Sequence, residues 1–190
     1  MTVIVMASLF YSCSEEYERV LEEKQKEIFP QGITKDFVLT YTEVSKPLRL
    51  QDKDTARVIV ILRSSLNENY ENLRFRHQLF PEGIVLDFFD ESDQKTIIKA
   101  DYATVYSLTN LIELEGNVVI ETHDNKILYT DKLFWDRQDS WIFTPEAFTF
   151  ENPEDGTVMH GLGLDFNRDF TYFYAMQTYG VMNVEEESDD

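Results

Sequence analysis

The sequence of this 190-residue chain predicts an all-β fold: a sandwich, a barrel or a roll. First, from residue 36 onward, short segments rich in β-branched and aromatic residues are separated by turn-forming groups such as Pro81-Glu82-Gly83 and His123-Asp124-Asn125. Second, the same part of the chain contains an internal repeat of 30 residues. Third, no long helical pattern follows residue 30.

Residues 1–13 are expected to be a lipoprotein signal-like segment. They read MTVIVMASLFYSC, an uncharged apolar stretch that suits the apolar region of an export signal better than a membrane-spanning helix. The single cysteine, Cys13, follows the small residue Ser12, and this resembles the lipobox of bacterial lipoproteins, in which the cysteine receives lipid. We therefore expect lipidation at Cys13. The alternative is a short buried strand with an incidental core cysteine.

Three further segments follow from charge and composition. Residues 14–34 are expected to be an acidic linker, because residues 15–29 carry six glutamates and few apolar positions. Residues 35–182 form the predicted β domain, and residues 183–190 an acidic disordered tail. The formal net charge of −19 argues against a nucleic-acid partner, since binding phosphates requires an excess of lysine and arginine.

Within the domain, apolar and polar residues alternate along the predicted strands. The first predicted strand contains Phe37, Leu39 and Tyr41, each with a polar or smaller neighbour. The later ones are residues 58–62, 85–89, 97–100, 111–120, 127–129, 132–135, 141–143, 148–150 and 172–174. Short strands at this spacing are typical of all-β domains.

The repeat is visible when the sequence is shifted by 30 residues, so that Ile97 falls on Ile127 and Asp101 on Asp131. A weaker third copy begins at Thr157. Each unit is expected to hold two strands and two turns, and it cannot bury its apolar face alone. Several units must therefore stack, which leaves a strand edge at each end of the stack.

The repeats carry a family resemblance. In order, A-D-Y-A…L-E-G-N-V-V-I, L-Y-T-D-K-L-F-W-D…I-F-T and D-G-T-V-M-H-G-L-G-L-D resemble the LptC family, across residues 35–178. LptC is the periplasmic component of the lipopolysaccharide export machine of Gram-negative bacteria. The segment L-F-P-E-G-I-V-L-D-F-F-D is also similar to the lipoprotein-like branch of this family.

This resemblance implies a twisted β-jellyroll of two facing sheets, whose apolar interior accepts the acyl chains of lipopolysaccharide. It also implies two kinds of protein partner: the subunits of an inner-membrane ABC transporter, which supply the energy, and an LptA-like periplasmic bridge protein. Such a chain is not an enzyme and needs no cofactor or metal. With lipid on Cys13, it is expected at the periplasmic face of the inner membrane.

The expected site residues come from the alternation and from the stack. The lipid-binding residues share one face of the repeated strands and are Ile112, Leu114, Val118, Ile120, Ile142, Phe148 and Phe150. Burial of an acyl chain there is worth about 0.8 kcal/mol per CH₂, although the same face also suits an ordinary core. The partner-binding edges are expected at Phe37, Leu39 and Tyr41 and at Tyr172 and Tyr174.

Other functions were weighed against this one. The sequence has no G-x-S-x-G and no phosphate-binding loop motif, and its three histidines never pair at metal-ligand spacing. The acids from Asp87 to Asp93 lack the order of a calcium loop and are expected in a solvated turn. Two alternatives stay open: an LptA-like soluble bridge protein, and a β-sandwich surface lipoprotein that binds protein or carbohydrate.

Overall fold

The computed structural model describes residues 28–44, 56–167 and 172–181. Within these ranges the chain forms eleven strands and no helix, which confirms the predicted all-β fold. The strands are β1 (Gly32–Val44), β2 (Ala56–Asn69), β3 (His77–Phe80), β4 (Ile84–Phe89), β5 (Lys95–Ala100), β6 (Tyr102–Tyr106), β7 (Leu111–Glu121), β8 (Ile127–Asp136), β9 (Trp141–Asn152), β10 (Thr157–Asn167) and β11 (Phe173–Val181).

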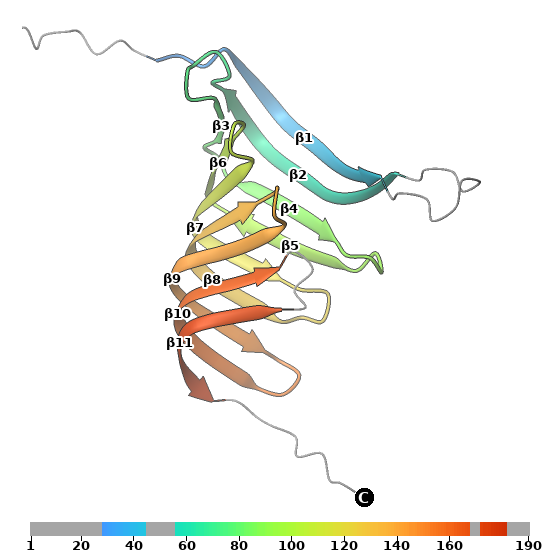
Figure 1. The fold of residues 1–190 in the computed structure, drawn as a ribbon, viewed down its shortest axis with the longest axis vertical. Helices are drawn as coiled ribbons and strands as arrows, with labels where there is room; N and C mark the ends of the chain where they lie inside the picture. The colour runs from blue at the N-terminus through green and yellow to red at the C-terminus, as the bar shows by residue number, and fades with distance from the viewer. Residues whose placement is uncertain (1–27, 45–55, 168–171, 182–190) are drawn as a thin grey trace, which may run out of the picture.

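All eleven strands belong to one antiparallel sheet that is folded over on itself (Figure 1). β3 and β4 act as two halves of one bent strand, because β2 pairs with both. β5 and β6 do the same against β7. The bends divide the sheet into two facing layers, so the expected two facing sheets are parts of one continuous sheet. This is the twisted β-jellyroll that the family resemblance implied.

The bends lie where the pairing register between neighbouring strands shifts by one residue. In β8, Leu128 and Thr130 are buried before the bend and Leu133 and Trp135 after it, and β7 and β9 each pass this corner with one residue more than β8. A strand with one extra residue bends and twists locally, as in a β-bulge. The sequence analysis treated residues 127–129 and 132–135 as two strands, and the structure joins them into one.

One of the two repeated aspartates, Asp101, occupies the corner between β5 and β6. Its backbone N–H donates to the carbonyl of Gly116 at 3.0 Å, and its carboxylate accepts a 2.6 Å hydrogen bond from Asn117. Gly116 and Asn117 have φ angles of 75° and 45°, a left-handed conformation that these two residue types tolerate best. The corner therefore gives Asp101 a structural role.

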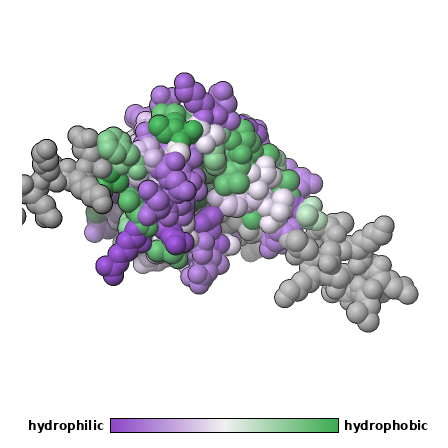
Figure 2. All heavy atoms as spheres, turned by 90° about the horizontal axis from the view of Figure 1, so that it is seen from above, coloured by the Kyte–Doolittle hydropathy of each residue, from purple (hydrophilic) through white to green (hydrophobic). Residues whose placement is uncertain are grey.

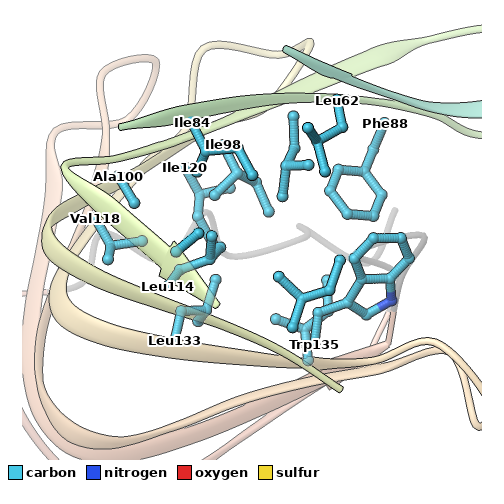
Figure 3. Close-up of a cluster of buried hydrophobic side chains, with 14 of the residues drawn as sticks. Leu62, Ile84, Phe88, Ile98, Ala100, Leu114, Val118, Ile120, Leu133 and Trp135 are labelled. Carbon is cyan, nitrogen blue, oxygen red and sulfur yellow. The ribbon is translucent and has the colours of Figure 1, made fainter. Parts of the chain in front are cut away.

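The core lies between the two layers and consists of two facing rows of cross-strand neighbours (Figure 3). The first row is Leu62, Leu86, Ile98, Ile120, Leu128, Phe150 and Met159. The second row is Val105, Ile112, Trp135, Ile142, Phe166 and Phe173. Because both rows cross the successive repeats, the interior is one continuous apolar slot.

Candidate functional site

The residues predicted to contact lipid all face this slot. Ile112, Leu114, Val118, Ile120, Ile142 and Phe148 are buried, and Phe150 is half-buried. Sequence reasoning missed Leu128, Met159, Leu164, Phe166 and Phe173, which share the slot. The third repeat was too weak in the sequence to place the last four of these residues.

Free space in the slot lies at its carboxy-terminal end. A cavity of about 330 Å³ opens there between the two rows, within the size range of ligand pockets. Its apolar lining comprises Ile120, Ile127, Leu128, Phe150, Met159, Leu164, Phe166 and Phe173. Two of the predicted lipid-binding residues, Ile120 and Phe150, therefore border the cavity, while the other five lie outside its lining.

The rim of the cavity carries a cation in the turn between β7 and β8. Lys126 Nζ lies 2.6 Å from a carboxylate oxygen of Asp124, and Thr122 donates a 2.5 Å hydrogen bond to the same carboxyl group. Burial alone raises the pKa of Asp124, but the hydrogen bonds from Lys126 and Thr122 outweigh it and lower the pKa. The carboxylate of Asp124 is thus held charged at neutral pH beside an apolar cavity.

Aromatic rings fill the amino-terminal end of the slot. The ring centroids of Phe88 and Trp135 lie 4.7 Å apart, and Tyr41 of β1 meets Trp135 edge-on at 6.2 Å. Arg137, in the turn after β8, donates a 3.1 Å hydrogen bond to the Tyr41 hydroxyl and lies 5.3 Å from its ring centroid. The edge strand β1 therefore covers the slot at this end.

The two edge strands expected to bind partners differ in exposure. Phe37, Leu39 and Tyr41 in β1 are half-buried and pack against the core. Tyr172 directly precedes β11 and Tyr174 lies within it, and both are more than half exposed. β11 reads FYAMQTYGV and has no charged residue, so nothing on it discourages pairing with another strand.

The outer face of the roll carries an ionic cluster on β6, β7 and β8. Lys132 Nζ forms an ion pair with Glu113 and another with Glu115 at 2.7 Å, and Tyr106 donates a 2.7 Å hydrogen bond to Glu113. Burial raises the pKa of Glu113, but the hydrogen bonds from Lys132 and Tyr106 reverse this and lower it. Burial and the bond to Glu113 raise the pKa of Tyr106 to about 12.

Asp87 corrects one expectation. It lies in β4 rather than in a solvated turn, is buried, and pairs with Arg63 at 2.5 Å and Lys95 at 4.0 Å. The turn is made instead by Asp90, whose carboxylate accepts hydrogen bonds from the backbone of Ser92 and Gln94 at 2.8 Å. The charged partners that allow burial of Asp87 are distant in sequence, and the local pattern could not reveal them.

Two searches of the described ranges gave no site of another kind. No group of three or more potential metal ligands comes together there. No helix in the same ranges has the length and apolar character needed to cross a membrane. Cys13, the predicted lipidation site, lies outside the described residues.

The fold and the slot together define a class: an antiparallel β-roll whose apolar interior is open at one end. The sequence matches the family model described as lipopolysaccharide-assembly, LptC-related, over residues 1–170. The chain therefore belongs to the LptC family, whose members are transport components rather than enzymes. The family associates with the inner membrane on its periplasmic side and works with lipopolysaccharide and the transporter subunits. A search of curated proteins finds no match.

Proposed function

We propose that this chain binds lipopolysaccharide by its acyl chains and relays it from an inner-membrane ABC transporter to an LptA-like bridge protein. The observation that carries the proposal is the cavity of about 330 Å³ between the two apolar rows. Each CH₂ removed from water there contributes about 0.8 kcal/mol.

The two ends of the roll support a direction of transfer. The cavity lies beside β11, where the slot ends at Phe166 and Phe173. A bridge protein that adds a strand to β11 would extend the slot, and the lipid would move on without meeting water. The β1 end, with Phe37, Leu39 and Tyr41, is then the side that faces the transporter.

Photo-cross-linking in living cells tests lipid binding. A photoreactive phenylalanine analogue in place of Phe150, which lines the cavity, should capture lipopolysaccharide. The same analogue at Glu121, which is exposed on the opposite face of β7 from Ile120, should not. Equal capture at both positions, or none at Phe150, would contradict binding in the slot.

We further propose that lipid on Cys13 holds the chain at the membrane, on the basis of the uncharged segment before it. Mass spectrometry of the membrane-bound protein should find a chain that begins at a lipidated Cys13. An intact Met1 on that protein would contradict anchoring through Cys13.

A further inference from the structure

We propose that the β11 edge recognises its partner through one cationic side chain, an arginine or a lysine. This side chain binds on the outer face of the roll, where Asp165 lies between Phe143 and Tyr174. The inference rests on the proposed function, in which β11 pairs with a strand of the bridge protein, and it specifies the chemistry of that pairing.

The chain contains one filled example of such a site. Lys132 Nζ lies 2.7 Å from the carboxylate of Glu115, is paired with Glu113, and lies 5.2 Å from the ring centroid of Phe134. The ammonium group of Lys132 therefore interacts with two carboxylates and with an aromatic ring. These are the two kinds of group that stabilise an ammonium or guanidinium ion at a protein surface.

A single cross-strand row connects this filled site to the open one. On the outer face, Glu113, Phe134, Phe143, Asp165 and Tyr174 are successive neighbours from β7 to β11. Phe134 and Phe143 stack in the middle of the row, with ring centroids 5.1 Å apart. Each end of the row thus presents a carboxylate beside aromatic rings.

The carboxylates at the two ends of this row differ in whether a cation is paired with them. Glu113 has Lys132, whereas Asp165 forms no ion pair within the described part of the chain. The buried neighbours Leu164 and Phe166 face the core, so the intervening Asp165 points outward beside the exposed ring of Tyr174. β11 itself contributes no charge, and the described chain therefore leaves this position open to a cation from outside.

The geometry of strand addition selects the kind of side chain. Neighbouring strands lie about 4.8 Å apart, so a strand added to β11 lies roughly 10 Å from β10, which carries Asp165. Lysine and arginine combine a positive charge with a stem long enough to cross Tyr174 and approach Asp165. A short or neutral side chain at that position of the partner would leave the carboxylate unpaired.

The test measures the affinity of the chain for the bridge protein of the same organism at several salt concentrations. Asp165→Asn should weaken binding about five- to tenfold at low salt and make the affinity less dependent on salt. Tyr174→Leu, which keeps the strand but removes the ring, should weaken binding about threefold. The matched control Glu121→Gln removes the same charge from a distant exposed site and should change the affinity less than twofold.

A proline variant separates this inference from the proposed function. Ala175→Pro removes an N–H that points to the free edge of β11 and should abolish binding in a roll that is still folded by circular dichroism. If Ala175→Pro does not bind while Asp165→Asn and Glu121→Gln have equal effects, the cation site is wrong but pairing at the β11 edge remains supported. If the unaltered chain does not bind the bridge protein, or Ala175→Pro still binds it, both proposals are overturned.

Discussion

The two ends of the roll share one continuous apolar interior, yet one end is closed and the other is open. At the amino-terminal end, Phe88 and Trp135 fill the slot and Tyr41 of β1 covers them. At the carboxy-terminal end, the rows continue to Met159 and Phe173, but a cavity lies between them. Seen from the β1 end, the surface is dominated by hydrophilic side chains with separate apolar patches between them (Figure 2).

The difference teaches that hydrophobicity alone does not decide which part of a repetitive core can hold a ligand. Ile142 and Phe173 are cross-strand members of the same row, but Ile142 is fully buried and Phe173 is 60% exposed. The two residues differ in exposure because Ile142 has a strand on either side of its own, whereas Phe173 lies on the last strand of the sheet. The end of the stack therefore has both an open cavity and an unpaired edge.

The largest expected effect compares truncations in the two ends. Leu86→Ala, in the closed end, should lower the free energy of unfolding by about 2–5 kcal/mol, because it leaves a cavity in a packed core. Phe173→Ala, at the open end, should cost less than about 1 kcal/mol, since most of its ring is already in water. Urea unfolding of both variants measures this, and similar losses would contradict the distinction between the ends.

A glycine pair gives a smaller contrast. A Cβ atom on Gly161 would lie 2.3 Å from the carbonyl oxygen of Gln177 in β11 and 2.5 Å from the ring of Phe148. Gly161→Ala should therefore displace β11 and lower the free energy of unfolding by about 1–3 kcal/mol. Gly32→Ala, in β1, meets nothing within 4 Å and should stay within about 0.5 kcal/mol of the unaltered chain. Thermal unfolding followed by circular dichroism checks both.

The pH dependence of stability can be tested at Glu113, which forms an ion pair with Lys132. The pKa of Glu113 is lowered in the folded state, so its stabilisation is present above its ordinary pKa of 4.5 and is lost as the pH falls through the folded value. Glu113→Gln should shrink the stability difference between neutral and acidic pH by about 1 kcal/mol. Urea titrations of the variant and the unaltered chain at the two pH values measure the difference.

The smallest effect is expected at Trp135, whose buried Nε1 has no hydrogen-bond partner among the described residues. Trp135→Phe removes this unsatisfied donor and some packing area, and the two changes oppose each other. The free energy of unfolding should change by less than about 1 kcal/mol. A loss of several kcal/mol in urea unfolding would mean that the indole ring itself closes the slot.

The sequence was sufficient for most of the strands and for the inward face of the repeat, because both follow from a period of two. β3, β6 and β10 were not among the predicted strands. Ile112, Leu114, Val118 and Ile120 keep the same phase through the corner of β7, and all four are buried. The phase slips in β8 at Asp131, and there the local pattern indicated two strands instead of one. Pattern reasoning handles such a corner poorly, because a bulge is set by pairing with the neighbouring strands.

The position of the open end could not be predicted in this way. The cover at the closed end depends on Tyr41 and Arg137, two residues far apart in the sequence whose contact appears only in the folded chain. The cavity likewise depends on how far the weakly repetitive third unit extends the rows through Leu164 and Phe166. The sequence gives the type of each of these residues, but it does not give the distance between the two layers of the roll.

Free edges at opposite ends of one roll also have a consequence for self-association (Figure 1). The β1 edge of one copy can meet the β11 edge of the next, and such a head-to-tail contact does not close into a symmetric dimer but continues without limit into a fibre. The net charge of −19 opposes each added copy at neutral pH and fades as the carboxylates are protonated near the isoelectric point of 4.4. The negative charge of the chain then opposes polymerisation at neutral pH. Light scattering should therefore increase when the solution is acidified.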